Sequence, residues 1–353
     1  MLCACNSHAA PTPEDGASEP SREVIVGAQD TASYMPLLRE RRVAVLANHT
    51  AMYDTERHIV DMMHAEGINI VGIFAPEHGF RGAVEAGAKI EDGTDSKTGI
   101  AILSLYNGNT QRPSDDVMRS FDVLVVDMQD VGLRFYTYYI SMLRMVDACA
   151  DFGCEVVVLD RPNPNGHYVD GPILDMKYKS GVGWLPIPVV HGMTMGEIAT
   201  MAIGEGWAKP AKLTVVKCQN YDHTTHYTLP IAPSPNLPTQ HSIYLYPTTC
   251  LFEGTVLSMG RGTEAPFEIY GHPDLKGYDF SFTPTPNAGS AKPPHMGKLC
   301  YGEDLRTLSN EEIWDAGIDL SYIVRAYHNL GIEEKFFTQM FEKLMGVSYV
   351  REM

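Results

Sequence analysis

The segment of the chain with the most chemical potential is a turn that carries a carboxylate, an imidazole and a guanidinium. Glu77, His78 and Arg81 lie in this turn together with two glycines, directly after the apolar run 68–74. That run predicts a buried strand, and ligand crevices in open α/β sheets form at the carboxyl ends of the strands. Three ionisable groups are more than a simple connection needs. The turn therefore predicts a functional site.

Two later turns, residues 127–138 and 160–166, carry similar side chains after apolar runs of their own. Their candidate site residues are Asp127, Gln129, Asp130, Arg134, Tyr136, Asp160, Arg161 and Asn163. Because parallel strands share a direction, we expect all three turns to lie along one edge of the sheet and to meet around one pocket. The alternative is that Asp127 and Asp160 only cap loops and pair with Arg134 and Arg161. Several buried ion pairs at one edge would be costly to desolvate, which favours a functional cleft.

The second half adds three polar segments. They contain His191 in segment 190–194, Asn236 in segment 234–236, and Arg261, Glu264 and Glu268 in segment 260–268. The last segment is flanked by glycine but lacks the lysine and Ser/Thr pair of a phosphate-binding loop. Two interpretations of this segment remain open. It can be a turn that an Arg261–glutamate ion pair only stabilises, or it can be part of a site.

Apolar runs alternate with helical patterns through the first half. The runs are 42–47, 68–74, 100–105, 123–126 and 155–159, and they are nearly continuous in Val, Ile and Leu. Such runs are typical of parallel strands buried on both faces. Helices are predicted at 55–66 and 138–152, each followed by a glycine suited to a left-handed conformation. The fold class predicted is α/β, with a Rossmann-like doubly wound parallel sheet over residues 23–170.

From about residue 171 the chain becomes rich in proline, and its strand patterns become short and mixed. Capping-box sequences predict helices that begin after Thr194 and Ser309. The run 320–345 predicts two helices separated at Gly331. We expect residues 171–353 to form a second, smaller α+β domain that closes a cleft against the first.

Composition limits the classes of function. The chain of 353 residues has a formal net charge of −17 without a block of like charge, so a nucleic-acid partner is not expected. No apolar run approaches the roughly 20 residues of a membrane span, so the body of the protein is predicted to be soluble. No G-x-G-x-x-G follows the first strand and no G-x-S-x-G is present, so a dinucleotide cofactor and a serine hydrolase are disfavoured.

A metal site is the next alternative. His49, Glu77, His78, Asp127 and Asp160 are of the types that a metal-dependent phosphoesterase uses, but their spacing lacks the usual ligand clusters. The seven cysteines show no C-x-x-C pair, and the central five are expected to be small buried hydrophobes, with a Cys149–Cys154 disulfide as the minor alternative. We therefore expect no metal and no other cofactor.

The first residues, Leu2-Cys3-Ala4-Cys5, resemble the end of a bacterial lipobox in which Cys5 is lipidated. Residues 6–22 are too polar to fold and predict a tether. The charged and apolar parts of a signal peptide are missing. The favoured interpretation is a start codon further upstream and an exported, periplasmic or membrane-anchored bacterial lipoprotein. A chance resemblance is the alternative.

Taken together, the motifs resemble one family, the NamZ-type exo-β-N-acetylmuramidases of glycoside hydrolase family 171. The segments that carry the resemblance occur in the family's order from about Arg42 onwards: Asn48-His49-Thr50, the Glu77 turn, 127–138, 160–166, 171–172, 191–197, 233–238 and 260–268. The resemblance implies release of N-acetylmuramic acid from the non-reducing ends of peptidoglycan fragments, in a cleft between a Rossmann-like domain and a smaller domain. It also implies that the glutamate of E-H-G-F-R-G, here Glu77, is catalytic.

The chain departs from the family pattern at two places. Members continue beyond the last helix with further helical residues and a Tyr-rich end, whereas this sequence stops at Met353, so we expect a final packing element to be missing or replaced. Glu264 stands where a small or neutral residue is expected, so no role is carried over to it.

The chemistry of glycoside hydrolysis fits these residues. We expect Glu77 to be the general acid, with a pKa raised by partial burial. His78 or Arg81 would orient it or bind the substrate's lactyl carboxylate, since an arginine can bond both carboxylate oxygens. Asp127, Asp130, Asp160, Glu264, Glu268 and the substrate's own acetamido oxygen are the alternatives for the second group. The residues expected to bind substrate are Asn48, His78, Arg81, Gln129, Asp130, Arg134, Tyr136, Arg161, Asn163, His191, Asn236, Arg261 and Glu268. A non-catalytic lipoprotein that only captures muramyl oligosaccharides is the alternative function.

Overall fold

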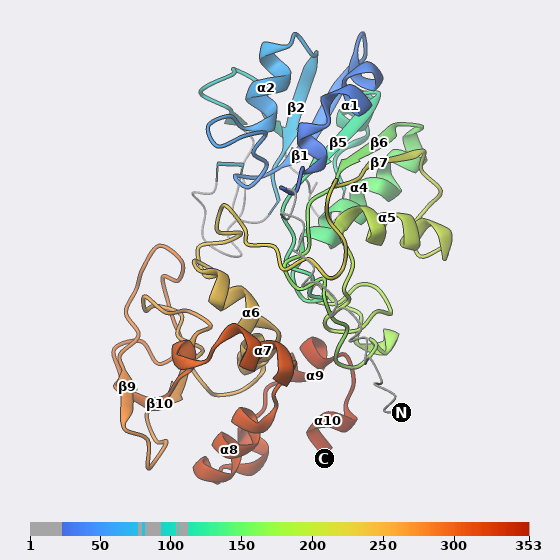
Figure 1. The fold of residues 1–353 in the computed structure, drawn as a ribbon. Coiled ribbons are helices and arrows are strands. Elements are labelled where there is room, and N and C mark those ends of the chain that lie inside the picture. Colours follow the sequence, from blue (N-terminus) through green and yellow to red (C-terminus); the bar gives the residue numbers. More distant parts are fainter. Residues whose placement is uncertain (1–22, 77–79, 82–92, 104, 106–111, 353) are drawn as a thin grey trace, which may run out of the picture.

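The computed structural model describes residues 23–76, 80–81, 93–103, 105 and 112–352. Glu77, His78 and Cys5, to which the sequence assigns roles, lie outside these ranges. Figure 1 shows an α/β part, which contains the parallel strands, packed above a second part, which contains helices α6 to α10 and a small sheet.

The α/β part is built around a sheet with the strand order β3-β4-β2-β1-β5-β6-β7. The neighbouring strands are parallel except for β3, which is antiparallel to β4. The strands are β1 (Val43–Ala47), β2 (Ile70–Phe74), β3 (Gly93–Thr94), β4 (Ala101–Leu103), β5 (Val123–Asp127), β6 (Glu155–Leu159) and β7 (Leu213–Val216). From β1 the chain first moves outward through β2 and β4, and then returns to β5 on the other side of β1. The topological switch point therefore lies between β1 and β5, where α/β proteins place their ligand sites.

Both faces of this sheet are buried, as the continuous Val and Ile runs predict. Val123 and Val125 of β5 belong to the core under helices α1 and α2. Leu124 and Val126 point to the opposite face, into the core shared with α4 and α5. The doubly wound α/β class is confirmed by this arrangement, in which helices cover both faces.

The helices of the described residues begin and end close to the positions that their capping residues dictate. They are α1 (Thr31–Leu38), α2 (Ile59–Ala65), α3 (Asp115–Met118), α4 (Tyr138–Phe152), α5 (Met195–Gly204), α6 (Gln240–Thr249), α7 (Asn310–Ala316), α8 (Ser321–Leu330), α9 (Gln339–Met345) and α10 (Tyr349–Glu352). The predicted capping boxes at Thr194 and Ser309 are present, and Gly153 and Gly331 end α4 and α8 in the left-handed conformation. Helix α2 begins later than predicted because Asp54 closes a tight turn with the N–H groups of Glu56 and Arg57.

The second part contains a three-stranded antiparallel sheet in the order β8-β10-β9. Its strands are β8 (Ile269–His272), β9 (Phe280–Phe282) and β10 (Cys300–Asp304). Its core is continuous with the α4/α5 side of the α/β part, since Tyr246, Phe252 and Phe341 belong to the same buried cluster as Leu124. The two parts thus share one core.

The α/β sheet continues beyond residue 170, where the sequence predicts a domain boundary. Strand β7 pairs in parallel with β6, and α5 packs on the same sheet, so the α/β part extends at least to Val216. Strand β7 contains only four residues, three of them half-buried, which conceals it from a search for long apolar runs.

The central cysteines are free thiols in the structure, and no Cys149–Cys154 disulfide is formed. Cys149, Cys154, Cys250 and Cys300 are buried and Cys218 is half-buried. Among the residues that the structure describes, no helix is long and apolar enough to cross a bilayer.

Candidate active site

The ends of β5 and β6 are joined by a buried ion pair rather than left open for substrate. Arg161 bonds Asp127 with two nitrogens, Nε to Oδ1 at 2.5 Å and Nη2 to Oδ2 at 2.9 Å. Its Nη2 also donates to the carbonyl of Met52 at 2.8 Å, in the loop that follows β1. The two side chains are only 5% and 0% exposed. Of the ion pairs that formed the alternative to a functional cleft, Asp127 with Arg161 is present, and it joins three strand ends at the switch point.

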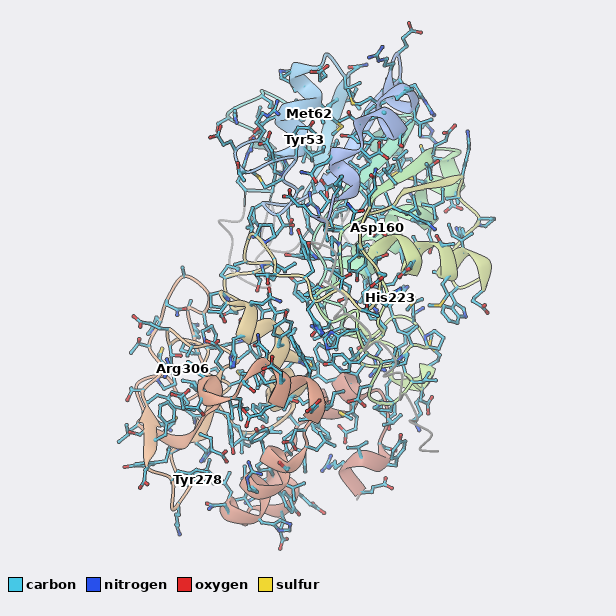
Figure 2. The ribbon with its side chains drawn as sticks, in the orientation of Figure 1. Tyr53, Met62, Asp160, His223, Tyr278 and Arg306 are labelled. Carbon is cyan, nitrogen blue, oxygen red and sulfur yellow. The ribbon has the colours of Figure 1, made fainter. Side chains whose placement is uncertain are left out.

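Asp160 follows β6 and caps the N-terminus of α5. Its Oδ1 accepts from the N–H of Gly196 at 2.9 Å and of Arg161 at 3.1 Å, and its Oδ2 accepts from Thr194 Oγ1 at 2.6 Å. Burial raises the pKa of Asp160 to about 6, although these three bonds oppose the rise. Asp160 lies in the half of the α/β part nearer the second part (Figure 2). Its contacts are those of a helix cap.

A chain of hydrogen bonds crosses the switch point. Asn48 Oδ1 accepts from Thr50 Oγ1 at 2.6 Å, and Thr50 Oγ1 in turn accepts from the N–H of Gln129 at 3.0 Å. Gln129 Nε2 donates to the carbonyls of Asp130 and Pro162 at 2.8 and 2.7 Å. All of these polar residues are buried. They hold the loops after β1, β5 and β6 in register.

Three of the predicted binding residues, Asp130, His191 and Arg134, are buried in the interior. Asp130 Oδ1 accepts from the N–H of Gly132 at 2.7 Å, while Oδ2 has no partner among the described residues. Burial raises the pKa of Asp130 to about 7. His191 accepts from the N–H of Met193 through Nδ1, and burial together with the charge of Arg134 lowers the pKa of His191 to about 3. His191 is therefore neutral, and both Asp130 and His191 are buried away from solvent.

Arg134 is fully buried and bonds main-chain carbonyls instead of a carboxylate. Its Nη1 donates to Pro172 and Ile187 at 2.7 and 2.8 Å, and its Nη2 donates to Leu344 and Met345 at 2.9 and 2.7 Å. Burial lowers the pKa of Arg134 to about 10. These contacts argue against the predicted substrate-binding role, because the guanidinium fills a structural position between the α/β part and α9.

Asn163 and Glu268 also have internal partners. Asn163 Nδ2 donates to Met193 O at 2.9 Å, and its Oδ1 accepts from the N–H of Asn165 at 2.8 Å. Glu268 accepts from Thr239 Oγ1 at 2.7 Å and lies 3.3 Å from His241 Nδ1, at the start of α6.

Arg81 is held by two carboxylates. Its guanidinium lies 2.9 Å from Asp95 and 3.2 Å from Asp61 of α2. Phe80, beside it, is buried edge-on against the ring of His58. Two carboxylates already compete for this arginine, which argues against its predicted role as the ligand of a substrate carboxylate.

A pocket of about 70 Å³ lies where the loop before α4 meets the second part. Tyr136, Asn236 and Arg261, all predicted from sequence, line it together. Its other lining residues are Phe135, Thr137, Tyr138, Ser234, Leu237, Tyr246 and Phe267. Segments 127–138, 234–236 and 260–268 thus contribute residues to one pocket, although the sequence predicts a common pocket only for the turns at Glu77, 127–138 and 160–166.

The pocket combines aromatic walls with fixed polar groups. The hydroxyls of Tyr136 and Tyr138 both donate to Pro233 O, at 3.1 and 3.3 Å, and their rings pack edge to face. Asn236 Nδ2 donates to Gly289 O at 2.7 Å, which keeps its carbonyl oxygen as an acceptor. Arg261 Nε donates to Glu253 Oε1 at 2.8 Å, and Nη2 lies 2.7 Å from the same oxygen in an ion pair. The turn-stabilising ion pair of Arg261 therefore exists, with Glu253 as its partner.

Sequence reasoning did not select Tyr246 or Glu253. Tyr246 lies in the aromatic stretch Ile243-Tyr244-Leu245-Tyr246 of α6, which a sequence pattern assigns to a core. Glu253 precedes a glycine in a short 3₁₀ turn, where nothing in the sequence marks it as the partner of an arginine eight residues later.

The described residues do not gather into a metal site. No group of three His, Cys, Asp or Glu side chains in the described ranges is arranged to hold an ion. Of the proposed ligands, Asp127 bonds Arg161, Asp160 caps α5, and His49 donates to Ala232 O at 2.8 Å. The phosphoesterase alternative thus loses its support from these three residues.

Comparisons with known proteins agree with the arrangement of two connected parts. The family model "Exo-beta-N-acetylmuramidase NamZ, N-terminal" matches residues 43–241, and its C-terminal counterpart matches residues 244–353. A Bacillus subtilis (strain 168) protein, "Peptidoglycan beta-N-acetylmuramidase NamZ", is 36% identical in an alignment 343 residues long that covers 90% of this chain and 81% of that protein.

Two crystal structures of DUF1343 family proteins from Bacteroides fragilis NCTC 9343 share the fold. One is 54% identical, with a TM-score of 0.88 over 94% of this chain and 90% of that chain. The other is 26% identical, with a TM-score of 0.76 over 93% and 90%. The two family models together cover nearly all of the described residues. The chain therefore belongs to the NamZ family of exo-β-N-acetylmuramidases.

Proposed function

We propose that this chain is an exo-acting glycoside hydrolase that releases N-acetylmuramic acid from the non-reducing ends of peptidoglycan fragments. The observation that carries the proposal is the match of both NamZ segments along the chain, together with a relative named as a peptidoglycan β-N-acetylmuramidase. The pocket supports it physically. Its aromatic walls and its few fixed polar groups are the combination that recognises part of a polar ligand.

Glu77 is proposed as the general acid. It follows Pro76, which is buried, and precedes Phe80, which is buried against His58. Strand β2, which leads to this segment, lies next to β1 and so beside the switch point. A glycosidase acid must hold a proton near neutral pH, which an apolar setting favours. The buried apolar residues on either side of Glu77 in the sequence support this assignment.

The choice of the second catalytic group is narrowed by the contacts of the carboxylates. The ion pair of Asp127, the helix cap of Asp160 and the bonds of Glu268 support structural roles for these three residues. Asp130, Glu264 and the substrate's own acetamido oxygen are then the remaining candidates among those named. A group that attacks or stabilises the oxocarbenium-like centre must reach the ring. The buried position of Asp130 weakens its candidacy.

The proposal is tested by the Glu77→Gln variant acting on a chromogenic β-N-acetylmuramide. We expect turnover to fall by roughly 10²–10⁴-fold, the usual contribution of a general acid. Glu66→Gln, which makes the same change at an exposed position, should retain wild-type turnover. Near-normal turnover by Glu77→Gln would refute the assignment, and a wild type that binds muramyl fragments without cleaving them would refute the proposed activity.

We further propose that the protein is exported and tethered to a membrane through lipid on Cys5. The lipobox-like sequence Leu2-Cys3-Ala4-Cys5 and the polar stretch after it support this location. A peptidoglycan substrate is accessible to an enzyme outside the cytoplasmic membrane, which fits the same location.

A further inference from the structure

The pocket at the start of α4 contains a cationic side chain whose hydrogen bonds leave donors unused. Arg261 lines this pocket and is only 21% exposed. Nε donates to Glu253 Oε1, Nη2 lies 2.7 Å from the same oxygen, and Nη1 makes no hydrogen bond to a described residue. A guanidinium has five N–H donors in one plane, so one carboxylate does not exhaust it.

Two contacts fix the orientation of this guanidinium. Glu253 holds one edge of it, and the ring of Phe267 lies against it with 5.0 Å between Cζ and the ring centroid. Phe267 in turn packs edge to face on Tyr246, another wall of the pocket. Because Arg261 is already ordered, binding an anion loses little side-chain entropy.

The rest of the pocket is suited to an anionic group. The Oγ of Ser234 has no hydrogen-bond partner among the described residues and lines the same pocket, where it can donate a further bond. Thr137 and Tyr138 place the N-terminus of the 15-residue helix α4 at the pocket wall, and the dipole of a helix favours negative charge there.

The size of the pocket limits what it holds. Sites for whole small molecules occupy roughly 300–1,000 Å³, whereas this pocket provides about 70 Å³. It therefore holds a substituent rather than a sugar ring. The substituent that distinguishes N-acetylmuramic acid from N-acetylglucosamine is a lactyl ether that ends in a carboxylate.

We propose that Arg261, with Ser234 and the start of α4, binds the lactyl carboxylate of the muramyl residue and so selects muramyl over glucosaminyl non-reducing ends. This inference rests on the proposed function. It assigns the carboxylate to Arg261 instead of Arg81, whose guanidinium already serves Asp61 and Asp95. Arginine suits this task because its planar donors match a carboxylate.

The test compares two chromogenic substrates, a β-N-acetylmuramide and the same glycoside with its lactyl carboxylate converted to the neutral carboxamide. For the wild type we expect kcat/KM to favour the acid by roughly 10–100-fold, the range for hydrogen bonds to a charged group. Arg261→Gln should bring the ratio close to one, mainly by slowing turnover of the acid. Arg261→Lys keeps the charge but loses the fork, and should give an intermediate ratio.

Arg325→Gln is the matched control, because Arg325 also pairs with a glutamate, Glu303, but on the exposed face of α8. Its ratio should equal that of the wild type. A wild-type ratio near one, or an unchanged ratio in folded Arg261→Gln, would overturn the assignment of Arg261 while the proposed activity stands. If Arg261→Gln does not fold, the wild-type ratio and Arg261→Lys decide. Absence of wild-type turnover on both substrates would instead refute the proposed function.

Discussion

Replacing Asp127 with asparagine separates a structural role from a catalytic one at the switch point. Asp127 is the last residue of β5. It is fully buried, and both of its carboxylate oxygens accept hydrogen bonds from Arg161. The Asp127→Asn variant keeps the shape of the side chain but removes its charge. The guanidinium of Arg161 is then left buried, and its remaining hydrogen bond to a described residue is to the carbonyl of Met52. Because this unbalanced charge has no access to water, we expect Asp127→Asn to lower the stability of the fold more than it lowers the catalytic rate.

The size of the effect follows from the contacts that are lost. Each hydrogen bond to a charged group contributes roughly 1.5–3 kcal/mol, and removing one member of a buried ion pair costs roughly 3–5 kcal/mol. Two bonds join Asp127 to Arg161, so both estimates give about 4 kcal/mol. The unfolding entropy of a chain of 353 residues is roughly 0.7 kcal/mol/K. The expected decrease in Tm is therefore roughly 5 °C.

Urea unfolding followed by tryptophan fluorescence measures the loss. Asp122→Asn is the control: Asp122 pairs with Arg42 at the surface, where a pair contributes about 1 kcal/mol or less. Combining Asp127→Asn with Arg161→Met should recover part of the stability, since the buried charge is then removed. A folded Asp127→Asn enzyme should lose less than about tenfold in kcat. A loss of roughly 10²–10⁴-fold at unchanged stability would refute this reasoning and make Asp127 a catalytic group.

Two further predictions concern Asp130 and Cys5. The folded pKa of Asp130, about 7, exceeds its ordinary value of 3.8, so the folded state retains a proton that the unfolded state loses. Stability contributed by this group is complete below about pH 4 and is lost as the pH rises to about 7, by an amount on the order of 4 kcal/mol. The free energy of unfolding from urea titrations should therefore fall between pH 4 and pH 8 for the wild type but not for Asp130→Asn. The same pH dependence in both proteins would contradict the raised pKa of Asp130. For Cys5, expression from an upstream start codon should give a lipid-labelled product in the membrane fraction, and Cys5→Ala should release it; an unlabelled wild type would contradict the tether.

The parallel sheet is predictable where its strands are long and buried on both faces. The runs at β1, β2, β5 and β6 are continuous in Val, Ile and Leu because helices cover both sides, and their positions agree with the sequence pattern. Strand β3 consists of Gly93 and Thr94 and carries no apolar signal. Strand β7 places intermediate, half-exposed residues at the end of the sheet, so its pattern is weak. Short edge strands obtain their stability from pairing, which composition does not record.

The sequence predicts which residues lie near the candidate site, but it predicts only part of what each of them does there. The sequence identifies Asp127, Asp160 and Arg134 as candidate site residues in turns that follow predicted strands. It does not show that an arginine 34 positions away satisfies Asp127, or that Arg134 bonds only carbonyls. Such pairings depend on strand register and on loops that approach in space. Arg261 was identified because glycines flank it, but its pocket needs Tyr246 from a helix that sequence reasoning assigned to no site.

The four carbonyls held by Arg134 have a consequence for recombination between relatives. Pro172 and Ile187 belong to the segment matched by the N-terminal family model, and Leu344 and Met345 belong to the C-terminal one. One side chain thus requires a matching backbone from both halves, and the pocket likewise takes walls from both. If the two segments came from distant members of the family, the backbone around Arg134 and the walls of the pocket would not fit together. We therefore expect the two segments to function as one unit, although two family models match them.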